Sequence, residues 1–396
     1  MTRIADLLPQ GSLVLVEGGA AASVALPGLV RDTDHLTFTG IVVPGVNRMP
    51  WLANPTARFE TFFMTPELAE AGDRVDFLPL AYSDIRRRLS SRAIDAALFS
   101  VAPPDADGMC SFGPTVDFIA DLWRDIPVRI AHINPLMPRT SGHPGIPRDA
   151  FHAAVEAPQP LTEVDDGAPD PRTATIAANV AAFIGDGATV QVGIGTLPGA
   201  VLRALRDRRD LSIHSGLIGD GAIDLLDSGA VPGGERIVTG LAIGTRRLYD
   251  ALPGSGIRFA PVAHTHDWAT IARHRDFVAV NSAMEVDLFG QGYSERTAGG
   301  WNSGTGGATD FARGAALGGG LRILALPASA RAASRIVPAG TGRGPATLSR
   351  TDTDIVVTEH GAADLRGLSH DARAAALIAI AAPAHREDLA RSWRTG

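Results

Sequence analysis

Two glycine-rich segments in the second half of the sequence have residue types that could stabilise charge during a reaction. The first is the turn Gly193-Ile194-Gly195, which follows a short run containing β-branched residues. Because glycine lets the backbone approach a ligand closely, the N–H groups of such a turn can donate hydrogen bonds to a developing oxyanion. A tight turn between a strand and a helix is an equally good interpretation. The second segment, residues 303–307 (SGTGG), is by itself more typical of an ordinary loop.

Cysteine and histidine are the other reactive residue types in the sequence. Cys110 is the single cysteine, which excludes an internal disulfide and a Cys-rich zinc site. A small apolar loop residue is the favoured interpretation of Cys110, although a thiol nucleophile is a second one. His264 and His266 would face the same side of a strand, but no third ligand is near them in sequence, so we expect no metal site.

The overall composition is typical of a soluble enzyme. The 396 residues are 45% hydrophobic and 20% charged, with a net charge of -7 that argues against nucleic-acid binding through basic patches. Apolar runs such as residues 374–382 are far shorter than the roughly 20 residues that a membrane-spanning helix needs. The segment up to Gly19 lacks the basic start and apolar stretch of a signal peptide. With a single cysteine, these features favour a cytoplasmic protein without a membrane partner.

The elements that position these residues occur twice. Residues 11–19 and 187–195 match at two glycines and two valines without a gap, and residues 39–41 pair with 215–217 at the same spacing along the chain. At a slightly larger spacing, two later pairs also match: residues 77–81 with 259–263, and 105–108 with 287–290. The change of spacing is what a short loop insertion produces. Four ordered matches indicate an internal duplication.

Each copy begins with a short strand-like run ending in glycines, followed by an alanine- and leucine-rich stretch that favours a helix. This alternation predicts an α/β protein made of two similar open parallel-sheet domains. Residues 157–172 carry four prolines and several acidic residues without apolar periodicity, which is typical of a surface linker. We therefore predict an N-terminal domain over residues 1–160, a linker over 161–172 and a C-terminal domain over 173–396.

Eight segments spread over most of the chain resemble the acetyl-CoA hydrolase/transferase family, including acetate- and 4-hydroxybutyrate-type CoA-transferases. They occur in the family's order and spacing, and their combination is far more specific than any one of them. The segments are residues 105–113 (DADGMCSFG), 134–140 (NPLMPRT), 191–198 (QVGIGTLP), 214–218 (HSGLI), 281–288 (NSAMEVDL), 303–311 (SGTGGATDF), 334–338 (SRIVP) and 357–367 (VTEHGAADLRG).

The resemblance implies a CoA-transferase-like fold and a site for CoA or acyl-CoA, which would be a substrate or ligand rather than a bound cofactor. The backbone near Val192 and the Gly306-Gly307 pair would lie against the thioester. A carboxylic acid would be the second substrate of a transfer reaction, and a homodimer is a further expectation. The residues implied in CoA binding are Gly193, Ile194, Gly195, Thr196, Leu197, Asn281, Ser303, Gly304, Gly306 and Gly307. No phosphate-binding loop or dinucleotide fingerprint points to another nucleotide cofactor.

The nucleophile of the family's transfer reaction is missing from its expected position. Members that transfer CoA use a glutamate, the third residue of an H-S-E motif, which carries CoA as a glutamyl thioester. Here the motif reads His214-Ser215-Gly216, and the spacing of the repeat pairs Gly216 with Gly40 of the first copy. The position that resemblance assigns to covalent chemistry therefore has no side chain.

Three interpretations follow from this replacement. The favoured one is an acyl-CoA hydrolase, or another non-transfer reaction such as decarboxylation, in which water attacks and His214 could be the general base. A histidine held by hydrogen bonds in a packed sheet is an equal alternative for His214. In the second interpretation, Glu17, Glu285 or Glu359 substitutes as the nucleophile, although Glu359 could instead contact substrate or cap a helix. The third is an acyl-CoA-binding protein without catalysis.

Overall fold

The computed structural model describes residues 4–395, which form two compact units. The first unit runs to Val164 and also includes Ile237–Thr265 and Asn302–Gly306. The second comprises Asp165–Arg236, His266–Trp301 and the chain from Gly307 onward. These units are defined by packing and contain non-consecutive segments, so the domain boundaries expected from the sequence stay a prediction.

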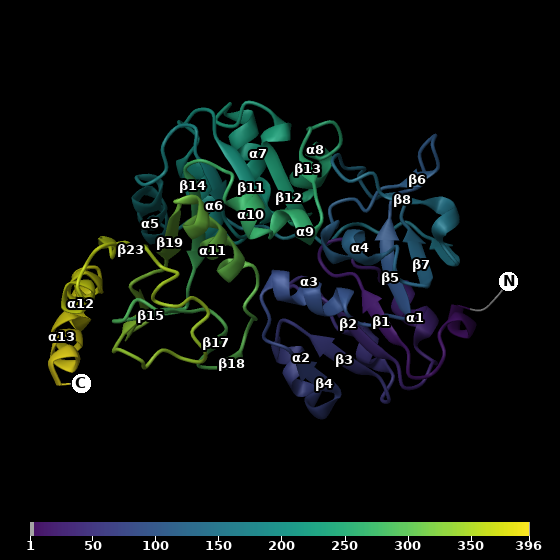
Figure 1. Cartoon of the computed structure of the whole chain (residues 1–396), viewed down its shortest axis with the longest axis horizontal. Coiled ribbons are helices and arrows are strands. Elements are labelled where there is room, and N and C mark those ends of the chain that lie inside the picture. The colour runs from purple at the N-terminus through teal and green to yellow at the C-terminus, as the bar shows by residue number, and fades with distance from the viewer. Residues whose placement is uncertain (1–3, 396) are drawn as a thin grey trace. The chain divides into compact units, whose positions relative to one another are not determined.

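The first unit is built on a seven-stranded sheet with the order β4-β3-β2-β1-β5-β7-β9, purple to blue in Figure 1. Every neighbouring pair in this sheet runs parallel. The strands are β1 (Leu13–Val16), β2 (Thr37–Gly40), β3 (Arg58–Thr61), β4 (Val75–Phe77), β5 (Ala96–Val101), β7 (Val128–Ile133) and β9 (Ala153–Glu156).

Short helices and a second group of strands complete this unit. Its helices are α1 (Leu26–Val30), α2 (Pro66–Glu70), α3 (Tyr82–Ser90), α4 (Asp117–Leu122), α8 (Arg246–Ala251) and α9 (Val262–Thr265), with 3-10 turns at Ile4–Leu7, Pro50–Ala53, Gly72–Arg74 and Arg148–Ala150. The remaining strands are the antiparallel pair β6 (Met109–Cys110) and β8 (Ile146–Pro147) and the parallel pair β12 (Ile237–Ala242) and β13 (Arg258–Phe259).

The second unit contains the neighbouring strands β11-β10-β14-β19-β23-β24. They run parallel except for β24, which is antiparallel to β23. These strands are β10 (Thr189–Gln191), β11 (Ser212–Ile218), β14 (Phe277–Ser282), β19 (Leu321–Ala325), β23 (Ile355–Thr358) and β24 (Gly361–Asp364).

Helices and several short strands surround this sheet. The helices are α5 (Pro171–Ala181), α6 (Thr196–Ala204), α7 (Asp220–Asp227), α10 (Trp268–Ile271), α11 (Ala308–Gly318), α12 (His370–Ala379) and α13 (Arg386–Thr395), with 3-10 turns at Gly234–Arg236 and Pro383–His385. The short strands are β15 (Glu285–Asp287), β16 (Gly292–Tyr293), β17 (Arg296–Thr297), β18 (Gly300–Trp301), β20 (Ser329–Ala330), β21 (Ala333–Ser334) and β22 (Ile336–Val337).

Local sequence signals explain where several helices begin. Asp170 accepts a hydrogen bond from the N–H of Thr173 at the start of α5, and a proline occupies the first helical position. Ser369 accepts from the N–H of Ala372 in the same way at the start of α12. Such caps satisfy N–H groups that have no partner inside the helix, and proline loses nothing there because its missing N–H would be unpaired.

The two sheets share a strand order, which confirms two similar parallel-sheet regions. The order β2-β1-β5-β7-β9 of the first unit matches β11-β10-β14-β19-β23 of the second. Within each group the strands are parallel, and their first strands are the two runs that match in sequence.

The strand register corrects one detail of the repeat. Leu13 pairs with Thr37 in the first copy, and the same spacing in the second copy would place Ile213 opposite Thr189. Thr189 instead pairs with Ser212, so the connection between the two strands is shorter by a single position. The pairing of Gly216 with Gly40 that sequence spacing suggests is wrong, because the ladder makes Ser215 the structural equivalent of Gly40.

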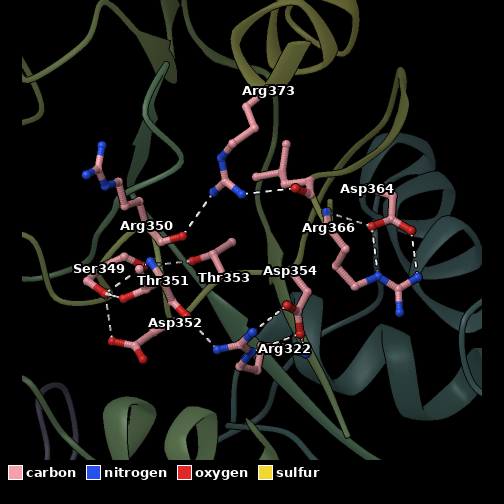
Figure 2. A network of polar contacts seen from close by, with 11 residues as sticks. Arg322, Ser349, Arg350, Thr351, Asp352, Thr353, Asp354, Asp364, Arg366 and Arg373 are labelled. Carbon is pink, nitrogen blue, oxygen red and sulfur yellow. Dashed lines mark hydrogen bonds and ion pairs between the residues drawn. The ribbon is translucent and has the colours of Figure 1, made fainter. Parts of the chain in front are cut away.

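A network of arginines and carboxylates connects β19, the segment before β23 and α12 in the second unit (Figure 2). Arg322 of β19 forms a two-pronged ion pair with Asp354, which directly precedes β23, and also donates to the carbonyl of Thr351. Arg373 of α12 donates to the carbonyls of Leu365 and Arg350. Paired guanidinium and carboxylate groups of this geometry fix orientation as well as charge, so the network ties α12 to the sheet edge.

Residues 4–395 lack two features that the sequence also gave no reason to expect. None of the helices there is long and apolar enough to cross a membrane. Within the same range, no group of three or more His, Cys, Asp or Glu side chains is arranged to hold a metal ion.

Candidate functional site

The glycine turn predicted from sequence lies between β10 and α6 in the second unit. Val192 is buried, while Gly193 and Gly195 are half-buried. Gly195 has φ +110°, which strongly favours glycine, and a Cβ at Gly193 would meet no other atom within 4 Å. There is thus open space beside the turn, as the approach of a ligand requires.

One N–H of this turn already has a partner. The N–H of Gly195 donates to a carboxylate oxygen of Asp166 at 2.8 Å, and the hydroxyl of Thr196 donates to the carbonyl of the same aspartate at 2.7 Å. Burial raises the pKa of Asp166, while the hydrogen bond from Gly195 lowers it. In this conformation the amide of Gly195 is therefore committed to Asp166 rather than offered to a ligand.

The H-S-G motif lies on β11, beside the end of β10. Ser215 is buried, and its hydroxyl oxygen is 2.8 Å from the carbonyl oxygen of Val192. His214 is also buried and packs against the rings of His274 at 4.7 Å and Phe311 at 6.5 Å. A Cβ at Gly216 would lie 3.7 Å from the ring of Phe311, so positions 214 and 216 face the same side of the strand, as alternation predicts.

The imidazole of His266 fills the space beside Gly216. A Cβ at Gly216 would lie 2.6 Å from Cε1 and 2.7 Å from Nε2 of His266, distances that real Cβ atoms do not tolerate. A Cβ at Gly307 would lie 2.5 Å from the same Nε2. The ring packs on Phe311 with centroids 4.8 Å apart. Two glycines, one on β11 and one at the start of α11, therefore make room for one buried histidine.

The environment of His266 favours the neutral imidazole. The residue is 3% exposed, and burial lowers its pKa to about 3, with a further contribution from His214. The N-terminal end of α11, which begins just after Gly307, would also disfavour an imidazolium. At neutral pH the ring is therefore uncharged.

Sequence reasoning missed this role for His266. It placed His264 and His266 on one strand, whereas His264 lies in the short helix α9 and is exposed, and His266 follows that helix and is buried. Nothing in the residues around position 266 indicates which glycines it meets. The only available signal was a histidine among polar neighbours that could not be assigned to a metal.

The second glycine-rich segment is held by backbone packing. A Cβ at Gly304 would lie 2.0 Å from the carbonyl oxygen of Phe62, and the carbonyl of Ser303 accepts a hydrogen bond from the N–H of Met64. Gly306 has φ +60°, and Gly307 precedes the first residue of α11. Glycine at position 304 is therefore required by the fold itself, and the predicted contacts of this segment with CoA stay a prediction.

The remaining predicted CoA-binding residues lie on elements of the second unit. Thr196 and Leu197 form the first turn of α6, and Ile194 is half-buried in the turn before it. Asn281 is half-buried near the end of β14, opposite Leu324 of β19. Their roles in binding also stay predictions.

Glu17 occupies a buried pocket in the first unit. Its carboxylate accepts a hydrogen bond from the N–H of Ser100 at 2.7 Å, while Oε1 is buried without a hydrogen-bond partner among the described residues. Glu17 and Asp117 both line a cavity of about 20 Å³, enough for one water-sized molecule. Burial, with a smaller contribution from Asp117, raises the pKa of Glu17 to about 8. A carboxyl group that is protonated at neutral pH is a poor nucleophile.

The other two candidate carboxylates bind backbone N–H groups in the second unit. Glu285 of β15 accepts from the N–H of Arg343 at 2.9 Å, and the guanidinium of that arginine is 3.9 Å away. Glu359, just after β23, accepts from the N–H of Ala328 at 2.8 Å. Both carboxylates therefore have structural partners.

Cys110 is enclosed by protein. It lies in β6 with no exposed surface, and burial raises the pKa of its thiol. Since the thiolate is the reactive form, these conditions favour an inert side chain.

Comparison with known proteins identifies the family. Residues 244–393 match the acetyl-CoA hydrolase/transferase C-terminal domain. The chain is 36% identical over 335 residues to a 4-hydroxybutyrate coenzyme A transferase of Clostridium kluyveri, covering 81% of this chain and 78% of that protein. The chain belongs to the acetyl-CoA hydrolase/transferase family. It is thus an enzyme of CoA thioesters, as the motifs predicted.

Two further members of the family match nearly the whole chain. A succinyl-CoA:cyclohexane-1-carboxylate CoA transferase of Geobacter metallireducens is 31% identical over 396 residues, covering 96% of this chain and 89% of that protein. The crystal structure of RipA from Yersinia pestis superposes with a TM-score of 0.90 at 29% identity, covering 99% of this chain and 95% of RipA. The predicted CoA-transferase-like fold is confirmed.

Proposed function

We propose that this member of the acetyl-CoA hydrolase/transferase family acts on short acyl-CoA thioesters without transferring CoA through residue 216, and that hydrolysis is its reaction. The observation that carries the proposal is the pair formed by Gly216 and His266. Position 216 has no side chain, and a buried imidazole fills the space into which a side chain would extend.

The chemistry of transfer explains why this pair matters. A glutamate nucleophile attacks the acyl-CoA carbonyl, and CoA leaves to give a mixed anhydride. CoA then attacks the glutamyl carbonyl, the carboxylate of the acyl group leaves, and a glutamyl thioester remains, which divides one exchange into easier steps. Without a carboxylate at position 216, this covalent intermediate cannot form there. Water then becomes the acceptor of the acyl group, and the products are a carboxylic acid and free CoA.

Transfer through another carboxylate is the second candidate, and the contacts of the three glutamates weigh against it. The raised pKa of Glu17 keeps its carboxyl group protonated at neutral pH. Glu285 and Glu359 each accept a hydrogen bond from a backbone N–H that fixes the carboxylate. An attacking group must also be placed to within about 1 Å of its reactive geometry, which substitution from a different element rarely achieves.

The deciding experiment separates the possible products. The purified enzyme is incubated with acetyl-, propionyl-, butyryl-, 4-hydroxybutyryl- and malonyl-CoA, with and without acetate, and free thiol, CO₂ and exchanged acyl-CoA are measured separately. We expect thiol release that needs no acetate. Cys110 has no exposed surface and should contribute little to the thiol signal. Acetate-dependent exchange would instead support transfer, CO₂ release would indicate decarboxylation, and ligand binding without turnover would indicate a binding protein.

A variant pair tests the assignment of position 216. Gly216→Glu alone places the new side chain against His266, whereas Gly216→Glu combined with His266→Ala removes the obstructing ring. We expect acyl exchange into acetate, with a glutamyl thioester trapped at position 216, only in the double variant. The single variant His266→Ala is the matched control and should show no exchange.

A further inference from the structure

A small cavity of the first unit is lined by buried oxygen atoms that lack hydrogen-bond partners. It has a volume of about 20 Å³ and lies where the ends of β1 and β2 meet the start of α4. Glu17 is 9% exposed and Thr115 is 3% exposed, and both line the cavity. Among the described residues, neither Oε1 of Glu17 nor Oγ1 of Thr115 has a hydrogen-bond partner. Buried oxygens of this kind nearly always bind another residue or an ordered water molecule.

The size of the cavity and the chemistry of its lining favour one kind of ligand. A water molecule needs roughly 10 to 15 Å³ of such space, so the cavity accepts one water but no acyl group. Asp117 lines it together with Glu17 and Thr115. Three polar side chains match the two to four partners that a buried water typically has, whereas purely apolar cavities stay dry.

The protonation of the two acidic side chains also suits a water molecule. Burial raises the pKa of both Glu17 and Asp117 to about 8, so at neutral pH the carboxyl groups are mostly protonated. Oε2 of Glu17 accepts a hydrogen bond from the N–H of Ser100, which leaves Oε1 available to the cavity. A water molecule can accept hydrogen bonds from protonated carboxyl groups and donate one to a threonine hydroxyl, whereas a metal ion requires ionised ligands.

We propose that this cavity is a binding site for one water molecule, which joins Glu17, Thr115 and Asp117 into a single hydrogen-bonded unit. This unit connects the end of β1 to the start of α4. Asp117 has φ +25°, which is unusual for a residue other than glycine, so its surroundings must hold its backbone in place. The water supplies part of that support. The inference is independent of the proposed hydrolysis.

The site also explains how the two copies of the repeat differ. By the spacing of the repeat, Glu17 corresponds to Gly193 of the second unit, beside which there is open space. In the first unit, a carboxyl group and one water fill the corresponding place, which therefore has no room for a larger ligand.

The test is a crystal structure of the full-length enzyme at a resolution that shows ordered water, repeated for a set of variants. In the wild type we expect one peak of electron density in the cavity, about 2.5 to 3.0 Å from Oε1 of Glu17 and Oγ1 of Thr115. Glu17→Gln keeps a polar side chain and should keep the peak. Glu17→Met and Thr115→Val remove the polar atoms with little change in size and should lose it.

Amide hydrogen exchange of residues 113–122 gives a second readout in solution. We expect exchange about three- to tenfold faster in Glu17→Met and Thr115→Val than in the wild type, and no change in Glu17→Gln. Thr33→Val is the matched control, because the hydroxyl of Thr33 is also buried without a partner among the described residues but does not line the cavity. It should change neither the peak nor the exchange.

Each of three results would overturn the proposal. The first is a wild-type cavity without density, and the second is density and exchange that stay unchanged in both Glu17→Met and Thr115→Val. The third is a peak with contacts shorter than hydrogen bonds that disappears when sodium is replaced by choline, which would make the cavity a cation site. The proposed hydrolysis is measured by thiol release and would stand in all three cases.

Discussion

Strand β2 approaches the end of β1 in the first unit differently from the way β11 approaches the end of β10 in the second unit. In the first unit, a Cβ at Gly40 would lie 2.2 Å from the carbonyl oxygen of Val16, so the backbones themselves require glycine. In the second unit, Ser215 occupies the equivalent place, and its hydroxyl is 2.8 Å from the carbonyl oxygen of Val192. Gly216 is one residue further along and meets a side chain, His266, rather than backbone.

This difference shows that two glycines at matching sequence spacing can be glycine for unrelated reasons. Gly40 faces the backbone of Val16, and no change of side chain elsewhere would relieve that clash. At Gly216 the space for a side chain is blocked mainly by one side chain, that of His266, which mutation can remove. Position 216 of the second unit is therefore open to change through residue 266, whereas Gly40 of the first unit is fixed by the backbone.

Burial also shifts the pKa values of ionisable groups in opposite directions in the two units. The first unit buries the carboxyl groups of Glu17 and Asp117, and burial raises the pKa of each to about 8. The second unit buries His266, whose pKa burial lowers to about 3. In both units, burial favours the neutral form of the group. The neutral carboxyl groups are lost as pH rises, whereas the neutral imidazole is lost as pH falls.

The largest expected effect comes from Gly40→Ala. Because the new methyl group would press on a backbone carbonyl, we expect a loss of more than about 3 kcal/mol in the free energy of unfolding, or failure to fold. Urea denaturation followed by circular dichroism measures it. A loss below that of Gly216→Ala would contradict the distinction between the two glycines.

The free energy of unfolding should depend on pH through both Glu17 and His266. The contribution of Glu17 is complete below about pH 4.5 and is lost as pH rises towards 8, whereas that of His266 is complete above about pH 6.5 and is lost as pH falls towards 3. Each should amount to several kcal/mol at most, at about 1.4 kcal/mol per pKa unit.

Urea denaturation between pH 4 and pH 9 checks this pattern. Glu17→Gln should reduce the loss of unfolding free energy at alkaline pH. His266→Asn should reduce the loss of unfolding free energy at acid pH. Parallel pH profiles for wild type and both variants would show that neither group has a shifted pKa.

A smaller effect is expected from the pair of positions 216 and 266. Gly216→Ala should cost about 1 to 3 kcal/mol in the wild-type background, because its methyl group meets the imidazole. In the His266→Ala background, the same change should cost less by at least about 1 kcal/mol. A double-mutant cycle from urea denaturation measures this coupling, and additivity would mean that the ring does not limit position 216.

The smallest effects are expected from Glu285→Gln and Glu359→Gln. Each replaces a charged acceptor of a backbone N–H by a neutral one, so we expect a loss of about 1 kcal/mol or less in stability and less than about threefold in kcat for thiol release. Steady-state kinetics and thermal denaturation measure both. A loss of about 100-fold or more in acyl exchange from either variant would restore the substitute-carboxylate interpretation.

Much of the architecture could be predicted because it is encoded locally. The buried runs that form β1 and β10 and the glycines that follow them repeat at constant spacing, and this indicated two parallel sheets. The single-residue difference between the β1–β2 and β10–β11 registers could not be predicted. It arises from the length of the connection, which strand periodicity does not report.

By itself, the sequence determined the family, the duplicated α/β fold and the absence of a side chain at Gly216, because motifs, repeats and residue types are properties of the chain order. Only the tertiary structure decided that His266 fills that space, that Gly40 is held by Val16 and that Glu17 is buried with a raised pKa. These are properties of contact between residues far apart in sequence. The identity of a residue does not reveal its neighbour until the strands and helices have packed.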